Sequence, residues 1–190
     1  MSDQEFFTVN HTMTVNVEPL AEGEHFPSYD NFEGEIPAPF IVASEFSHLD
    51  MLNDSARAEL KNNDFKHVIQ LLDTQNSKLN LLLTFMLSQQ DDPSLRHQTH
   101  SFGASQFSYY SQHAIAIDIE TKVRVKLFLE HPAAAIYCYG HIAHIEDQSD
   151  KKLITVKYDL LRDLDQDLLI KAALFQQQKL LRQRSLNREK

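Results

Sequence analysis

The spacing of apolar residues divides most of the chain into a helical part and a strand part. Between about residues 47 and 90, apolar side chains recur every three or four positions, which is typical of amphipathic helices. From about residue 98 they alternate with polar side chains in short runs, which is typical of strands. Six strands are expected, at residues 98–106, 107–110, 113–118, 122–129, 134–146 and 151–159. Many short strands at this spacing predict an antiparallel barrel or sandwich.

Three helices are expected around these strands. The first begins near Ser47, a suitable N-cap with Asp50 three residues on, and ends before the polar run 62–64. The second covers residues 65–89, and the third covers about residues 161–184. The predicted fold class is therefore α+β, a six-stranded antiparallel barrel with a long helix before it and an amphipathic helix after it.

The first 47 residues differ in composition from the rest. They hold four of the six prolines, and proline restricts both itself and the residue before it to extended geometry. We therefore expect an extended acidic arm, with one partial strand near residues 8–17. The arm is rich in aromatic residues, so it is expected to pack along the protein rather than float free.

The helix at 65–89 carries a heptad repeat that predicts self-association. One core position holds Phe65, Leu72, Leu79 and Met86, and the other holds Val68, Gln75, Leu82 and Gln89. The apolar face is wider than a helix packed only on its own barrel requires, although that simpler packing remains an alternative. Gln75 could fix the register of such an assembly. We divide the chain into an N-terminal arm at 1–47, a helical oligomerisation region at 48–92, and a barrel with its C-terminal helix at 93–190.

Charge and composition narrow the class of protein. The single cysteine, Cys138, excludes an internal disulfide, and the N-terminus lacks the pattern of a secretory signal. No apolar run reaches the roughly 18 residues that a membrane span needs, so we expect a cytoplasmic protein without a span. The net charge of −9 argues against binding to duplex nucleic acid. The last 20 residues are basic, which suits a helix C-terminus and pairing with the acidic arm, or alternatively a nucleic-acid or lipid patch.

Signals of enzymatic chemistry are weak. Four glycines in 190 residues leave no phosphate-binding glycine-rich loop, and no HExxH or CxxC motif occurs. His141 and His144 lie three apart in an expected strand, which places them on opposite faces. Cys138 lies in an apolar strand, where a thiol is inert. We expect no catalytic residues, no metal site and no cofactor.

Two stretches of the chain resemble a known family. They are the helix QNSKLNLLLTFMLSQQ at 75–90, and the strands after residue 98 together with the segment YDLLRDLDQDLLIKAALFQQQ. The first resembles the helix of the atypical, tetramer-forming branch of the PilZ domains, and the second resembles a PilZ barrel with its C-terminal helix. The resemblance covers roughly residues 65–185. It implies a PilZ-like barrel and a role in cyclic di-GMP signalling.

Standard PilZ domains bind cyclic di-GMP through R-x-x-x-R and D/N-x-S-x-x-G motifs, and both are degraded here. The first reads Arg96-His97-Gln98-Thr99-His100, so only one arginine remains, and the second falls at residues 101–106. The residues that the resemblance assigns to nucleotide binding are Arg96, His100, Ser101 and Ser105. One guanidinium group clamps two phosphates poorly, so weak or absent binding is expected.

Four functions follow as hypotheses. The first is a non-enzymatic regulatory module that acts through an unknown protein partner and forms a homo-oligomer. The second is a genuine cyclic di-GMP receptor controlling motility, pili or biofilm, with Arg182 and Arg184 of the basic tail lent to the site. The third is a structural oligomer unrelated to signalling, and the fourth is an enzyme whose site a single sequence does not reveal.

Overall fold

The computed structural model describes residues 7–61, 65–111, 117–130, 133–148 and 150–188. Its strands are β1 (Thr8–Asn10), β2 (Thr14–Pro19), β3 (Arg96–Gly103), β4 (Gln106–Ser111), β5 (Lys122–Glu130), β6 (Ala133–Gln148) and β7 (Lys151–Leu160). Its helices are α1 (Tyr29–Glu35), α2 (Ala38–Lys61), α3 (Lys66–Ser88) and α4 (Asp163–Arg188).

The strands form one closed antiparallel barrel. Their order is β1-β3-β2-β5-β6-β7-β4, and an additional pairing of β3 with β4 closes the sheet. β1 and β2 pair with different ends of the same strand, since Val9 lies opposite Phe102 while Val15 lies opposite His97. They act as one interrupted strand, so the closed barrel has six strands, as the alternating pattern predicted.

The identity of the sixth strand differs from the prediction. The N-terminal strand takes the place between β3 and β5 that closes the ring. The strand expected at 113–118 lies largely outside the described residues, and Ile117 and Asp118 are not in a strand. The other five expected strands are confirmed, with ends that differ by a few residues.

Two apolar cores lie on the two sides of the barrel wall. The first fills the barrel interior with side chains such as Val125, Ile136 and Cys138, and the buried face of α4, including Leu169 and Ala173, joins it. Interior burial explains why the inward positions of β5 and β6 are apolar.

The second core covers the outer face of β5 and β6. It contains Tyr137 and Tyr139 of β6 together with Phe32 of α1, Phe40 of α2 and Leu83 of α3. Because β6 is buried on both faces here, all its residues from 134 to 140 are buried and the strand reads as an unbroken apolar and small-residue run.

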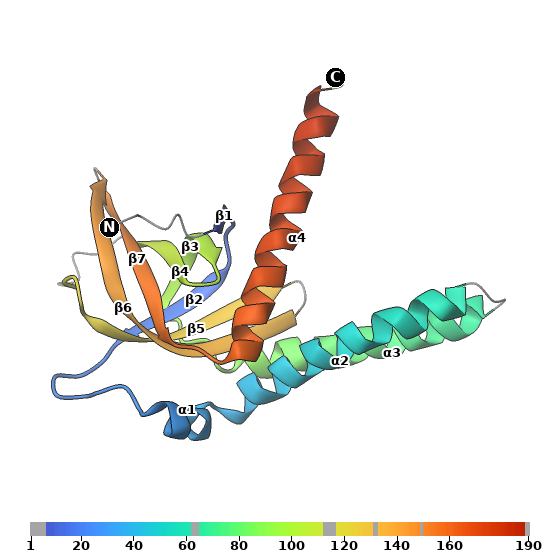
Figure 1. Ribbon diagram of the computed structural model, residues 1–190, viewed down its shortest axis with the longest axis horizontal. Coiled ribbons are helices and arrows are strands. Elements are labelled where there is room, and N and C mark those ends of the chain that lie inside the picture. The colour runs from blue at the N-terminus through green and yellow to red at the C-terminus, as the bar shows by residue number, and fades with distance from the viewer. Residues whose placement is uncertain (1–6, 62–64, 112–116, 131–132, 149, 189–190) are drawn as a thin grey trace.

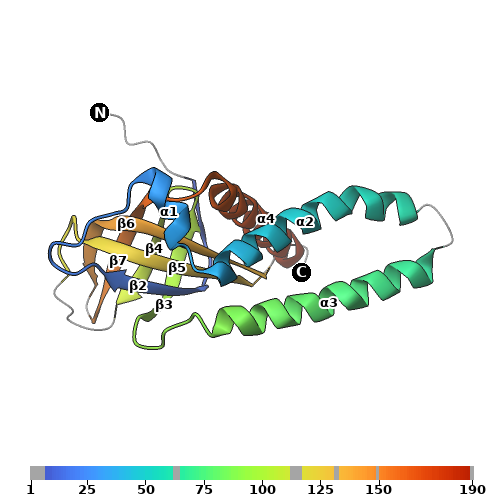
Figure 2. The same ribbon diagram turned by 90° about the horizontal axis from the view of Figure 1, so that it is seen from below.

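The helices leave the barrel in two directions. α2 and α3 form an antiparallel pair that projects away from the barrel, and α4 projects separately (Figures 1 and 2). Among the residues whose burial the structure describes, α2 contributes to the second core near its start, through Phe40 and Ala43, and α3 near its end, through Leu83 and Leu87. Among the described residues, no helix is long and apolar enough to cross a membrane.

The prediction of an extended arm over residues 1–47 is wrong from Tyr29 onwards, where the chain is helical, while the strand expected near residues 8–17 is present. β1 and β2 belong to the barrel, α1 covers its outer face, and α2 begins at Ala38 rather than near Ser47. The prolines misled the prediction because a proline in the first turn of a helix costs no hydrogen bond, and Pro39 occupies that position in α2.

Candidate functional site

A surface cavity lies beside the first residues of β3. Its volume is about 730 Å³, within the range of small-molecule sites. It is lined by Thr12, Pro93, Ser94, Arg96, His97, Gln98, Thr99, His100, Tyr110 and Lys151. Two of the four residues assigned to nucleotide binding, Arg96 and His100, therefore lie in one cavity.

Arg96 is already engaged by a carboxylate. Its Nη2 lies 2.7 Å from Oδ2 of Asp91, which follows the end of α3. The other carboxylate oxygen of Asp91 accepts a hydrogen bond from the side-chain amide of Asn16 at 2.8 Å. Arg96 thus links the start of β3 to the segment that follows α3, and it also lines the cavity.

The other end of the cavity combines rings with a second cation. His100 and Tyr110 meet edge to face with 5.2 Å between ring centroids, and Lys151 Nζ lies 3.5 Å from the centroid of Tyr110. Lys151 opens β7, far from Arg96 in sequence, and no local motif marks it. Sequence reasoning missed it because only closure of the barrel brings β7 beside β4.

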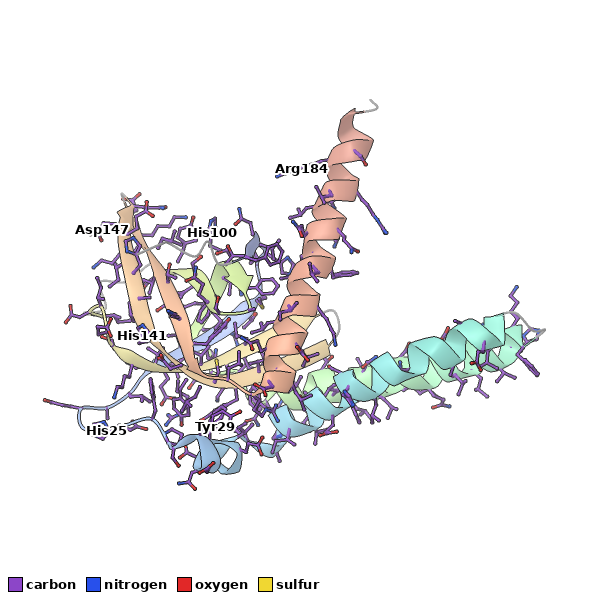
Figure 3. All side chains as sticks on the ribbon, in the orientation of Figure 1. His25, Tyr29, His100, His141, Asp147 and Arg184 are labelled. Carbon is purple, nitrogen blue, oxygen red and sulfur yellow. The ribbon has the colours of Figure 1, made fainter. Side chains whose placement is uncertain are left out.

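Ser101 and Ser105 are not among the residues that line this cavity. The hydroxyl of Ser101 shares a hydrogen bond of 2.7 Å with the hydroxyl of Ser108 across the β3–β4 pair. The carbonyl oxygen of Ser105 accepts a hydrogen bond from the backbone N–H of Tyr158. Arg184 lies on the projecting part of α4, well away from His100 (Figure 3). The structure therefore does not bring together the full residue set of the receptor hypothesis.

A second candidate surface is the apolar face of α3. Leu83 and Leu87 are buried, but Leu82 is 65% exposed and Phe85 is 67% exposed. Of the seven residues expected at an oligomer interface, Phe65, Val68, Leu72, Gln75, Leu79 and Leu82 are exposed in the single chain, and Met86 is half-buried against the second core. α2 does not cover this heptad face, which leaves it open to another chain.

A polar network fixes α1 and the preceding loop to the outer barrel face. Arg124 on β5 donates hydrogen bonds to Glu18 at 2.9 Å and to Glu24 at 2.8 Å. The hydroxyl of Tyr139 donates to Glu35 of α1 at 2.7 Å. Burial, with hydrogen bonds to Tyr137 and Glu35, raises the pKa of Tyr139. Arg124 thereby links β5 to Glu18 of β2 and to Glu24 of the loop that precedes α1.

The chain holds one cysteine, which is buried, and an exposed histidine–aspartate pair. Burial raises the pKa of the Cys138 thiol well above its usual value, which suppresses the reactive thiolate. His141 Nδ1 lies 2.7 Å from Asp159 Oδ2 on the outer barrel surface. In the part of the chain that the structure describes, no three His, Cys, Asp or Glu residues are grouped to hold a metal ion.

Comparison with known proteins gives structural relatives only. No protein-family model matches the chain, and no curated protein matches it. Among solved structures, the inhibitor of motility MotI/DgrA from Bacillus subtilis aligns over 94% of this chain and 53% of its own, at 10% identity and a TM-score of 0.51. The present chain spans about half the length of that protein.

A second solved structure matches nearly end to end. It is a protein from Xanthomonas campestris, described as a tetrameric PilZ domain self-assembled through a helical bundle. It aligns over 94% of this chain and 91% of its own, at 10% identity and a TM-score of 0.59. The predicted resemblance is confirmed at the level of architecture: the chain has the fold of a PilZ domain, with a closed six-stranded barrel and helices before and after it.

Proposed function

We propose that the chain is a non-enzymatic regulatory module of the PilZ class, which assembles through α3 and acts by protein contact in cyclic di-GMP signalling. The observation that carries the proposal is the exposed apolar face of α3. A soluble monomer rarely exposes a contiguous apolar surface of this kind. The partner proposed for this face is a second copy of the chain.

The composition of α3 favours such a partner. Its only permanent charges are Lys66, Asp73 and Lys78, so a second copy of the helix meets little charge repulsion. The apolar stripe repeats at heptad spacing, which suits packing of helix against helix. The Xanthomonas campestris protein of the same fold is described as self-assembling by a helical bundle, which supports the proposal further.

Light scattering on the full chain tests the assembly. Leu79→Glu with Leu82→Glu places two charges on the exposed stripe, and we expect this double variant to be monomeric while the unaltered chain is an oligomer. The matched control is the double variant Gln70→Glu with Ser77→Glu, which adds the same two charges on the opposite face of α3. This control is expected to stay oligomeric. A monomeric unaltered chain would contradict the proposal.

The nucleotide affinity is proposed to be weak or absent. Cyclic di-GMP carries two phosphates, but the cavity offers one arginine, which is bound to Asp91, and one lysine. Regulation then passes mainly through a protein partner, and the cytoplasm is the proposed location. A role in motility, pili or biofilm is part of the same proposal, and the name of the Bacillus subtilis relative, an inhibitor of motility, supports it.

The genuine receptor remains the second candidate, because Arg96 and His100 do share a cavity. Calorimetric titration with cyclic di-GMP separates the two functions. Low-micromolar binding that Arg96→Ala abolishes establishes the receptor, and heat no larger than that of dilution supports regulation by protein contact. The oligomeric state is measured on the same samples.

A further inference from the structure

The outer half of α4 is poorly packed in the single chain. Ala172 and Ala173 belong to the first core, and Ala173 is the last buried residue of the helix among those described. From residue 174 to residue 185, every side chain is exposed except that of Gln176, which is half-buried. Helices in proteins gain most of their stability from packing an apolar face, so this projecting segment favours docking on another surface (Figure 1).

The exposed side chains of this segment are largely apolar or basic. Leu174 and Leu181 are 45% and 57% exposed, and their spacing of seven residues places both on one face of the helix, opposite its buried face. Arg182 and Arg184 flank this face on its two sides, and neither pairs with a carboxylate in the described part of the chain. Residues 168–188 hold five bases and no acid. A suitable partner is therefore acidic and partly apolar.

The chain itself carries such a surface on α1. Residues 18–45 hold seven acids and no lysine or arginine. Three of these acids are bonded to side chains of the barrel. Asp30 and Glu33 are exposed, and the adjacent Tyr29 is 60% exposed. Tyr29, Asp30 and Glu33 thus form an acidic surface with an exposed ring, which complements the end of α4 in charge and in polarity.

Within one chain these two surfaces do not meet. Figure 3 shows Tyr29 beneath the barrel and Arg184 on the end of α4 that projects away on the other side. α1 packs on the outer face of β5 and β6, whereas the buried part of α4 belongs to the core inside the barrel. The basic end of α4 therefore reaches an acidic surface of this kind only on another molecule.

We propose that the projecting end of α4 docks on the acidic surface of α1 in a second copy of the chain. Arg182 and Arg184 lie against the carboxylates of that surface, and Leu181 packs against its tyrosine ring. Each copy carries both surfaces, so the contact either closes a dimer by two-fold symmetry or continues along a row of copies. The proposal goes beyond the proposed function and does not depend on assembly through α3.

The test first removes assembly through α3 from the measurement. Leu79→Gln with Leu82→Gln interrupts the apolar stripe of α3 without adding a charge that could attract α4. At an ionic strength of about 0.01 M, where the Debye length is about 30 Å, this variant should still associate through α4. At about 1 M salt, where the Debye length is about 3 Å, it should be monomeric. The same high salt isolates assembly through α3 in the light-scattering test of that helix, so failures of the two proposals are distinguishable.

Two charge reversals of the full chain, both made in the α3 glutamine variant, then identify the contact. One is Arg182→Glu with Arg184→Glu, and the other is Asp30→Lys with Glu33→Lys. Each variant alone should be monomeric at low ionic strength, because its two surfaces now carry like charges. An equimolar mixture should associate, with an average mass in light scattering that rises towards twice that of either variant alone, because opposite charges again face each other between the copies.

The matched control is Arg182→Lys with Arg184→Lys in the same background. It keeps both positive charges and should associate as the α3 glutamine variant does. Circular dichroism checks that every variant is folded, which is expected because all four altered positions are exposed. The proposal is overturned if the mixture stays monomeric at low ionic strength. It is equally overturned if the arginines are needed for binding to anionic vesicles or to RNA while the α3 glutamine variant does not associate with itself.

Discussion

Thr99 and Met13 bond to each other twice where the first barrel strand is interrupted. The backbone N–H of Thr99 donates to the carbonyl oxygen of Met13 at 3.0 Å, and the N–H of Met13 donates to the Thr99 hydroxyl at 3.0 Å. The same hydroxyl donates to the carbonyl oxygen of His11 at 2.7 Å. One side chain thus replaces the ladder hydrogen bonds that are missing between β1 and β2.

Thr99→Val is expected to destabilise the fold. Valine has the shape of threonine but satisfies neither the Met13 N–H nor the His11 carbonyl, and Thr99 is buried, so the loss is expected to be about 1–3 kcal/mol in unfolding free energy. Urea denaturation measures it. Thr14→Val is the control, because its hydroxyl only accepts a long, exposed bond of 3.3 Å from Gln98. Equal losses in the two variants would show that the hydroxyl of Thr99 does not bridge the interruption.

This interruption shows what the sequence could and could not predict. The partial alternation at 8–17 predicted a strand there, and β1 and β2 confirm it. Its partners β3 and β5 lie on the far side of three helices in the sequence, so no local pattern indicates that it completes the barrel. The side-chain bridge by Thr99 depends on the same long-range pairing.

Gly140→Ala is expected to cost about 1–3 kcal/mol through overpacking. A Cβ atom at Gly140 would run into the backbone carbonyl of Lys157 on the paired strand, and backbone cannot move aside as a flexible side chain can. Gly34→Ala is the opposite case, because Gly34 lies in α1 with open space around its Cβ position. There alanine should stabilise the fold by up to about 1 kcal/mol through helix propensity. Thermal unfolding of the two variants, followed by circular dichroism, should shift in opposite directions.

Asp165 should make the unfolding free energy depend on pH in the direction opposite to that of a carboxylate whose pKa is lowered by folding. It is fully buried in the first turn of α4 and accepts hydrogen bonds from Arg162 at 2.7 and 2.9 Å. Burial raises its pKa above the usual 3.8, although the Arg162 guanidinium and the Ser44 hydroxyl act in the opposite direction. Between the usual value and the raised one, the folded chain holds a proton that the unfolded chain releases.

The sign of the effect follows from proton linkage. The stability that Asp165 contributes is fully present below pH 3.8 and is lost as the pH rises through its folded pKa. The difference in unfolding free energy between the unaltered chain and Asp165→Asn should therefore decrease as the pH rises over this window. Urea titrations at a series of pH values measure it, with the exposed Asp163→Asn as control for a charge at the helix start. An increase with pH, the behaviour of a carboxylate whose pKa folding lowers, would contradict the assignment.

As with the fold, the sequence predicted those parts of the candidate site that a local motif marks, and it missed those that long-range strand pairing brings together. The degraded arginine motif pointed to Arg96 and His100, and they do share a cavity. The partner of Arg96 could not be inferred, because its pairing with Asp91 depends on how the connection between α3 and β3 folds. Lys151 and Tyr110 were missed because the barrel brings them in from other strands. Heptad spacing predicted an apolar stripe on α3, and six of its seven residues are exposed in the single chain. The spacing could not tell which leucines the chain covers itself.

Leu82 and Leu83 separate the two roles of α3. They are neighbours in sequence, yet Leu83 is 2% exposed, packed in the second core, and Leu82 is 65% exposed on the stripe. Leu83→Ala should lower the unfolding free energy by about 2–5 kcal/mol at any protein concentration, because it opens a cavity within one protomer.

Leu82→Ala should leave the protomer's own stability nearly unchanged but shift the oligomer towards monomer on dilution. It should lower the midpoint of unfolding only at concentrations where the unaltered chain is assembled. Denaturation and light scattering at two protein concentrations distinguish these outcomes. A concentration-independent loss of similar size in both variants would mean that Leu82 packs within its own chain, and the proposed assembly face would have to be abandoned.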